Sequence, residues 1–236
     1  VQKKKISHKD VKWINTLNEI KKGPVVFFGN EFFDAIPIKQ FKKVKKNFFE
    51  KNYSIKKNKK IKEVFIKAPP ASVKIIKSYK SLKNLKFIEF PQLGLQELKK
   101  INKKISELSG CVLMIDYGYL KPNNQNTLQS VMKHKKNNLL CNLGKADITA
   151  HVNFALLREF FKKDGLKVKN VITQKQFLEK MGILERAQVI SNKMKFKEQS
   201  DLYFRLKRLL GSNYMGNLFK VIMAYKFNNN NFAGFK

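Results

Sequence analysis

Two carboxylates and an amide follow a short apolar run near the start of the chain. In the segment PVVFFGNEFFDAIPIKQF, the residues Asn30, Glu31 and Asp34 come directly after this run. Two carboxylates at the end of a strand can hold a cation or a transferable proton. An ordinary alternative is a helix cap, with Asn30 as the capping residue and the acids in the first helical turn. Phe32 and Phe33 either wall such a site or belong to the core.

Two further polar clusters lie later in the chain. The first is DYGY, residues 116–119, where the glycine indicates a tight turn or a close backbone approach. The second is ADITAHVNF, which contains Asp147, Thr149, His151 and Asn153. A lone histidine is more often a hydrogen-bonded structural group than a catalyst, and Thr149 could equally cap the following helix. Only three histidines are present and no pair has ligand spacing, so we expect no metal site.

The cluster of Asn30, Glu31 and Asp34 and the DYGY cluster both follow apolar runs that predict strands of a parallel sheet. Val25–Phe28 and CVLMIDYGY, residues 111–119, are runs of the kind that is buried on both faces of such a sheet. Between them, residues 93–108 carry leucines and isoleucines at helical spacing, which predicts a helix leading into the second strand. Asp116 therefore falls at the carboxyl end of its strand, where ligands bind in open α/β sheets.

The rest of the chain alternates helices with strands, which indicates an α/β fold with helices on both faces of the sheet. We expect a main body formed by residues 1–40 and 92–236, and an insertion over 41–91 that contains a β-hairpin. The other expected elements are a basic helix end before Gly23, a helix over 154–161, a strand over 166–172, helices near 174–181 and 184–210, a strand over 218–225 and a flexible tail over 227–236.

The formal net charge is +33, yet only four of the 50 basic residues are arginine. Arginine reads phosphates and guanines best, so its scarcity argues against a dedicated nucleic-acid binder. Lys, Asn, Ile and Phe share A/T-rich codons, and a coding bias explains the composition without any ligand. No apolar run approaches the ~18 residues of a membrane span, and no secretory signal opens the chain. Cys111 and Cys141 lie in apolar contexts and are expected to be buried thiols.

Six segments carry a more specific pattern. In chain order they are GNEFFDAIPIKQF, VLMIDYGY, TLQSVMKHK, ADITAHVNF, TQKQFLEKMGILERA and MGNLFKVIMAYK. Together they resemble the MidA family, class I methyltransferases that use S-adenosylmethionine and include mitochondrial complex I assembly factors. The similarity covers essentially the whole chain, and the NEFFDA-P and IDYG motifs together are quite specific. The resemblance implies a Rossmann-like sheet.

The resemblance also implies parts that this sequence lacks. In the family, a Gly-rich cofactor turn follows the first strand, and an acid after the second strand binds the ribose hydroxyls. None of the eleven glycines forms a G-x-G pair, and the chain starts at Val1. We therefore expect an N-terminally truncated chain with a partial methyltransferase sheet that lacks its first strands. Such a chain is not expected to bind S-adenosylmethionine tightly.

Methyl transfer from S-adenosylmethionine to an arginine of a respiratory NADH dehydrogenase subunit is the activity that the resemblance implies. In this interpretation Glu31 and Asp34 grip the guanidinium and aim one nitrogen at the methyl group. His151, or else Asp147, takes the departing proton. The remaining expected roles are cofactor contacts from Asn30 and Asp116, aromatic walls from Phe32, Phe33 and Tyr117, and substrate binding by Asp147 and Asn153.

Two other functions stay open. One is a non-catalytic assembly protein that docks on a partner subunit, and the less favoured one is a basic nucleic-acid-binding protein. Arginine as the target rests on the resemblance alone, because the same carboxylates could orient a lysine or a small amine. We expect a cytoplasmic location in a bacterium, with the mitochondrial matrix as the alternative.

Overall fold

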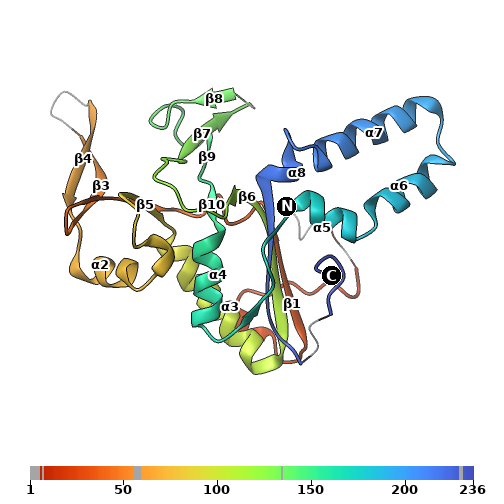
Figure 1. Cartoon of the computed structure of the whole chain (residues 1–236), viewed down its shortest axis with the longest axis horizontal. Coiled ribbons are helices and arrows are strands. Elements are labelled where there is room, and N and C mark those ends of the chain that lie inside the picture. Colours follow the sequence, from red (N-terminus) through yellow and green to blue (C-terminus); the bar gives the residue numbers. More distant parts are fainter. Residues whose placement is uncertain (1–5, 7, 56–59, 134, 229–230) are drawn as a thin grey trace.

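A mixed β-sheet forms the centre of the protein (Figure 1). The computed structural model describes residues 6, 8–55, 60–133, 135–228 and 231–236. The strands of the sheet are β1 (Val25–Asn30), β6 (Gly110–Tyr119), β10 (Val152–Asn153), β11 (Lys167–Val168), β12 (Ile172–Thr173) and β13 (Phe219–Lys226). Their order is β1-β6-β13-β11, with β10 on β6 and β12 on β13. β1 and β6 are parallel, whereas β13 runs antiparallel to β6.

The two strands that the apolar runs predict are confirmed and lie side by side. In their parallel register Val25 is opposite Gly110 and Asn30 is opposite Ile115. The predicted connecting helix is α3, Gln92–Leu108. Because the carboxyl ends of the two strands meet at one edge of the sheet, the residues after Asn30 begin next to Asp116.

Helices cover both faces of the sheet, as the alternation of elements predicts. One face packs Val112 and Met114 into the main core cluster with α3 and α4 (Phe154–Lys163). On the other face, Ile115 packs with Phe177 of α5 (Gln174–Lys180). Burial of apolar area on both faces is the main stabilising contribution to such a core.

The insertion is larger than the hairpin that the sequence predicts. It is a four-stranded antiparallel sheet of order β4-β3-β2-β5, with one helix and a 3-10 turn. Its elements are β2 (Lys39–Val44), β3 (Asn47–Ile55), β4 (Ile61–Lys67), α2 (Pro70–Lys77), η2 (Lys80–Leu82) and β5 (Phe87–Phe90). β3 and β4 form the expected hairpin. Phe41, Phe48 and Ile88 are buried in the same cluster as the main sheet, so the insertion is anchored on the body.

Several local predictions need correction. No helix precedes Gly23 in the described residues, where only the 3-10 turn η1 (Leu17–Glu19) occurs. The lysine-rich segment offers few apolar side chains for packing, and propensity alone stabilises short helices poorly. The helix expected over 184–210 is two helices, α6 (Ile183–Ser191) and α7 (Phe196–Leu210). The Lys195 N–H donates to Glu198 Oε2 at 2.8 Å and starts the second of them.

Cys111 is buried as predicted, but Cys141 is exposed, because it lies in a loop and not under a helix or strand. The segment predicted as a flexible tail carries two packed aromatic rings. Phe232 contacts Tyr225 and Phe235 contacts Phe177, with ring centroids 4.8 Å and 5.5 Å apart. These contacts hold the described part of the segment against the sheet, which a low-complexity sequence does not predict.

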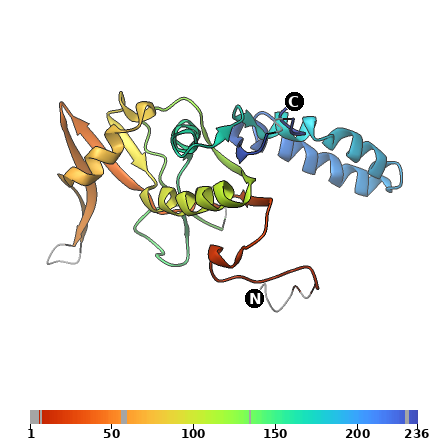
Figure 2. The ribbon, with the colours of Figure 1, turned by 90° about the horizontal axis from the view of Figure 1, so that it is seen from below.

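Three smaller parts extend from the body. A three-stranded sheet, formed by β7 (Gln129–Met132), β8 (Lys135–Asn137) and β9 (Asp147–Thr149), lies near β10 and the carboxyl end of β6 (Figure 1). The insertion and the α6–α7 pair lie at opposite ends of an elongated molecule (Figure 2). The short helix α8 (Met215–Leu218) joins α7 to β13. None of the described helices has the length and apolar character of a membrane span.

Gly118 is required by the close approach of β6 and β10, as its place in the sequence suggested. A Cβ atom at this position would lie 2.1 Å from the carbonyl oxygen of Val152. We expect Gly118→Ala to lower the free energy of unfolding by about 2–3 kcal/mol, because backbone has to move to relieve the overlap. Urea denaturation followed by circular dichroism measures this loss.

Gly29→Ala in the neighbouring strand is the matched control. A Cβ there would meet only the Cβ of Phe32, at 3.8 Å. The free energy of unfolding should therefore stay within about 1 kcal/mol of the wild type. Equal losses in the two variants would contradict the assignment of the close approach to Gly118.

Candidate active site

The turn that follows β1 is held by one buried carboxylate. Asp116 is 1% exposed. Its Oδ2 atom accepts hydrogen bonds from the backbone N–H groups of Phe32, Phe33 and Asp34 at 3.2, 2.9 and 3.2 Å. Its Oδ1 atom accepts one from the backbone N–H of Tyr117 at 2.9 Å. Successive amides that point at one anion form a concave binding site for negative charge. The turn residues therefore take their positions from Asp116.

These contacts favour a positioning role for Asp116 over the cofactor contact that the sequence predicts. Four accepted hydrogen bonds and nearly complete burial leave the carboxylate without an open side. Burial and the neighbouring Asp34 carboxylate raise the pKa of Asp116 to about 6, although the backbone N–H groups act in the opposite direction. The energetic cost of the buried charge is thus set partly by Asp34.

Asp34 is the central acid of the site. It is 7% exposed, and its Oδ2 atom accepts a hydrogen bond from the Tyr117 hydroxyl at 2.5 Å. Burial and this bond raise the pKa of Tyr117, so the phenol stays a donor. The Oδ1 atom of Asp34 is buried and has no hydrogen-bond partner within the described part of the chain. A buried oxygen of this kind is costly unless a ligand supplies a donor.

Glu31 occupies the first position after β1 in the left-handed region, with φ of 46°. A non-glycine residue in this region is strained, and such strain is typical of functional sites. Its N–H donates to the carbonyl of Ile115 at 3.0 Å, which extends the sheet register by one bond. The side chain is exposed. No helix follows in residues 31–38, so the alternative interpretation of Asn30 as a helix cap is wrong.

An acidic cavity of about 840 Å³ lies beyond the carboxyl ends of β1 and β6. Five of the site residues predicted from the sequence line it: Glu31, Asp34, Tyr117, Asp147 and His151. They come from three distant segments, and β9 supplies Asp147. Arg208 of α7, Met215 and Phe219 also line this cavity. The fold therefore brings the predicted acids and the histidine to one cavity.

His151 packs against the same tyrosine that binds Asp34. Its ring meets the Tyr117 ring edge-on, with centroids 5.3 Å apart. Burial lowers the pKa of His151, and the charge of Glu89 only partly counters this. Because the ordinary value is about 6.5, the imidazole is mainly neutral at neutral pH and can accept a proton.

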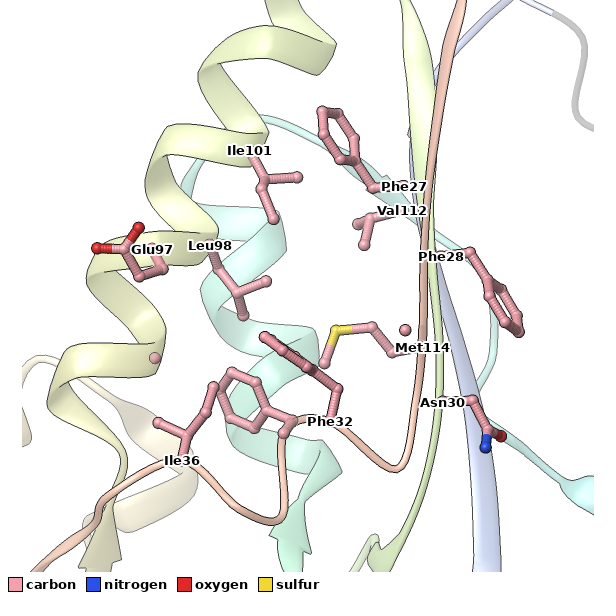
Figure 3. A pocket seen from close by; sticks show the side chains of 13 residues that line it. Phe27, Phe28, Asn30, Phe32, Ile36, Glu97, Leu98, Ile101, Val112 and Met114 are labelled. Atoms are coloured by element: carbon pink, nitrogen blue, oxygen red, sulfur yellow. The ribbon is translucent and has the colours of Figure 1, made fainter. Parts of the chain in front are cut away.

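The two phenylalanines of the turn lie outside the acidic cavity. Phe33 is 4% exposed and belongs to the core, where the absence of a side chain at Gly94 makes room for its ring. Phe32 is exposed and lines a separate apolar cavity of about 370 Å³ between β1 and α3. In Figure 3, Leu98 and Met114 point into this cavity. Of the predicted aromatic walls, only Tyr117 lines the acidic cavity.

The two predicted asparagines have different surroundings. Asn153 is buried and its Oδ1 atom accepts a hydrogen bond from the Leu156 N–H at 3.0 Å, so it caps α4. This contact assigns it a structural role where the sequence predicted substrate binding. Asn30 is exposed and projects from the opposite side of β1 to Phe27 (Figure 3). Its Nδ2 donates a long hydrogen bond to Glu31 Oε1 at 3.5 Å, and the side chain remains accessible from solvent.

Sequence reasoning missed one buried acid next to the site. Glu89 of β5 is 7% exposed and accepts hydrogen bonds from Gln40, from the Thr127 N–H and hydroxyl, and from the Leu128 N–H. The Thr127 hydroxyl oxygen in turn accepts a hydrogen bond from the backbone N–H of His151 at 3.0 Å. The sequence contained one signal for this buried acid, which is its position inside the apolar run FIEF, residues 87–90. Glu89 thereby supports His151 from the inserted sheet.

The pKa of Asp116 is expected to depend on the charge of Asp34. In Asp34→Asn the like charge is gone, so the ionised form of Asp116 becomes more favourable and its pKa falls below about 6, while burial, the larger cause, still holds it above its ordinary value. Titration of the side-chain carboxyl carbons by ¹³C NMR measures this change. Glu31→Gln is the control, because Glu31 is not among the groups that shift this pKa. An unchanged pKa in Asp34→Asn would contradict the coupling.

A family model of S-adenosyl-L-methionine-dependent methyltransferases matches residues 1–172. Among curated proteins, the chain is 28% identical over 222 residues to the mitochondrial protein arginine methyltransferase NDUFAF7 homolog of Caenorhabditis elegans. It is also 28% identical over 185 residues to protein arginine methyltransferase NDUFAF7, mitochondrial, of Homo sapiens. The alignments cover 89% and 78% of this chain but 50% and 41% of these proteins. The chain thus spans about half the length of the curated relatives it matches.

The fold is shared with two crystal structures of Burkholderia thailandensis proteins, which belong to one superfamily. Their TM-scores are 0.79 and 0.78 at 24% and 21% identity, and the second has S-adenosyl-homocysteine bound. The alignments cover 95% of this chain, and 60% and 58% of those chains. The fold, the conjunction of motifs at the carboxyl ends of β1 and β6, and the extent of the family match lead to one conclusion: the chain belongs to the MidA-type family of S-adenosylmethionine-dependent methyltransferases.

Proposed function

We propose that the protein is an S-adenosylmethionine-dependent protein arginine methyltransferase whose acidic cavity holds the target guanidinium. The observation that carries this proposal is the Oδ1 atom of Asp34, a buried carboxylate oxygen at the cavity without a donor in the described residues. The names of the curated relatives, which are protein arginine methyltransferases, support the same substrate group.

A guanidinium needs what these carboxylates offer. It keeps its charge at every physiological pH and has delocalised lone pairs, so it is a poor nucleophile until it is oriented. Asp34 can accept one N–H on its unpaired Oδ1 atom, and Glu31 can accept another from the exposed side of the cavity. Two such charge-assisted bonds fix the plane of the group and point one nitrogen in a single direction.

The residues around Asp34 keep this acceptor in place. The Tyr117 hydroxyl occupies the second oxygen of Asp34, so the carboxylate cannot rotate freely. Asp116 fixes the backbone of the turn by accepting hydrogen bonds from the N–H groups of Phe33 and Asp34. Glu31, Asp34 and Asp147 also give the cavity a local negative charge in a protein of net charge +33. This local field attracts a cationic side chain that reaches the cavity.

His151 is the proposed proton acceptor. Transfer of a methyl cation to a guanidinium that kept all its protons would give a dication, so one N–H proton has to leave the attacked nitrogen to give the singly charged methylguanidinium. The lowered pKa of His151 leaves its imidazole neutral at neutral pH, and the ring lines the cavity beside Tyr117. Asp147 is a second acceptor at the same cavity, on its exposed side.

S-adenosylmethionine, when bound, supplies an electrophilic methyl group. The described residues fit one side of this cofactor: Asn30 offers an exposed amide at the end of β1, and Glu31 and Asp34 favour a cationic neighbour. A Gly-rich turn for its carboxylate and an acid for its ribose are not among them. The fit is therefore partial, and the remaining contacts have to come from elsewhere.

The free edge of β1 is the place where the missing contacts would join. β1 pairs with β6 alone in the described structure, and Val26 and Phe28 on its outer face are 69% and 64% exposed. Such an edge favours pairing with another strand. We propose that a strand-bearing segment with the cofactor-binding turn pairs here in the active protein.

The finer identity of the substrate belongs to the same proposal. The resemblance to the MidA family implies an arginine of a respiratory NADH dehydrogenase subunit, and this stays a prediction. The curated relatives are named as mitochondrial proteins. The compartment of this chain stays a prediction as well, with a bacterial cytoplasm expected and the mitochondrial matrix as the alternative.

Removing either carboxylate of the clamp should abolish most of the activity. In the full-length protein, we expect Glu31→Gln and Asp34→Asn each to lower kcat/KM for an arginine substrate by about 100-fold, because each variant loses one charge-assisted bond that orients the guanidinium. Incorporation of a labelled methyl group measures this. The control is Glu185→Gln on α6, an exposed acid remote from the cavity. Unchanged methylation in both clamp variants would rule out the clamp.

Cofactor binding by the 236-residue chain alone should be weak. The described residues offer groups for only one side of the cofactor, so we expect no micromolar binding of S-adenosylmethionine. Isothermal titration calorimetry with the chain of residues 1–236 measures this directly. A dissociation constant in the micromolar range would overturn the proposal that a further segment completes the cofactor site.

A further inference from the structure

A second cavity adjoins the acidic one. It has a volume of about 440 Å³ and shares Arg208, Met215 and Leu218 with the acidic cavity. These three residues belong to α7 and α8, which lie next to each other at the start of β13 (Figure 1). Because the two cavities share a wall, an extended peptide with one side chain in the first reaches the second within a few residues.

The second cavity is basic and has no acid among its lining residues. Lys207 and Arg208 line it, Arg208 at the wall shared with the acidic cavity, and neither forms an ion pair with any acid in the described part of the chain. Phe204 and Tyr214 add aromatic surface and are 61% and 52% exposed. Unpaired cations beside exposed aromatic rings complement a ligand that is both acidic and apolar.

We propose that this second cavity binds the residues that flank the target arginine, and that it selects substrates with acidic and apolar side chains there. The inference rests on the proposed function of the acidic cavity and adds the class of substrate sequence. A substrate of this kind places its arginine on Asp34 and an acidic neighbour on Lys207. The pairing explains how a protein of net charge +33 recognises a cationic side chain without repelling its carrier.

The test uses fluorescein-labelled peptides and the chain of residues 1–236. The probe has a central arginine flanked by glutamate and leucine on both sides, and a matched peptide has lysine in place of glutamate. Any acidic peptide is attracted to so basic a protein, so the decisive comparison is between protein variants. Binding is measured by fluorescence anisotropy at about 150 mM salt, where long-range attraction is largely screened.

Lys207→Glu should weaken binding of the glutamate peptide about fivefold or more, because it reverses a charge at the cavity. Arg205→Glu is the matched control: it lies on the same helix, is exposed, changes the net charge equally and lines neither cavity. It should change the affinity less than twofold. Equal effects of the two variants, or none for Lys207→Glu, would overturn the inference.

A citrulline peptide separates the inference from the proposed function. Citrulline lacks the positive charge of arginine but leaves the flanks unchanged. If it binds as tightly as the arginine peptide while Lys207→Glu still weakens both, the clamp fails and the second cavity stands. Tighter Lys207-dependent binding of a single-stranded oligodeoxynucleotide than of the glutamate peptide would overturn the choice of a protein ligand.

Discussion

The site depends on the hydrogen bonds that the Asp116 carboxylate accepts from three backbone amides of the turn after β1. This set of bonds is the main constraint on its geometry. It joins the carboxyl ends of two parallel strands, and it directs both the turn and the tyrosine that follows it. A carboxylate can do this because it accepts several hydrogen bonds at once. The left-handed conformation of Glu31 and the burial of Asp34 follow from the same tight turn.

The carboxylates of Asp34 and Asp116 repel each other because both carry negative charge when ionised. Asp34 makes ionisation of Asp116 less favourable, while the backbone N–H groups make it more favourable. A cation at Asp34 would relieve part of the repulsion, so substrate binding and the stability of the turn are linked. The backbone N–H of His151 donates to the Thr127 hydroxyl, and that hydroxyl donates to Glu89 of the inserted sheet. The insertion is therefore connected to the acidic cavity through hydrogen bonds.

Much of the fold could be predicted from local patterns. The apolar runs of β1 and β6 and the helical spacing in α3 are signals within single segments, and the structure bears them out. The cluster of Glu31, Asp34, Tyr117, Asp147 and His151 followed from strand ends and motif resemblance. These features need no knowledge of distant contacts.

What the sequence could not resolve depends on partners far along the chain. Glu89 binds Thr127, 38 residues away, and no local pattern reveals that bond. Phe33 and Asn153 have the residue types of a binding wall, yet tertiary packing buries one and makes the other a helix cap. Asp116 was placed correctly at the strand end, but its role depends on where three amides of another segment point.

The exposed outer edge of β1 has a consequence for behaviour in solution. Two copies of a strand that shows Val26 and Phe28 to water can add to each other and grow into larger aggregates. Mutual repulsion between molecules of charge +33 opposes that growth at low ionic strength. The lysine-rich composition, whatever its origin in the coding sequence, thus keeps the chain dispersed, and concentrated salt removes the protection.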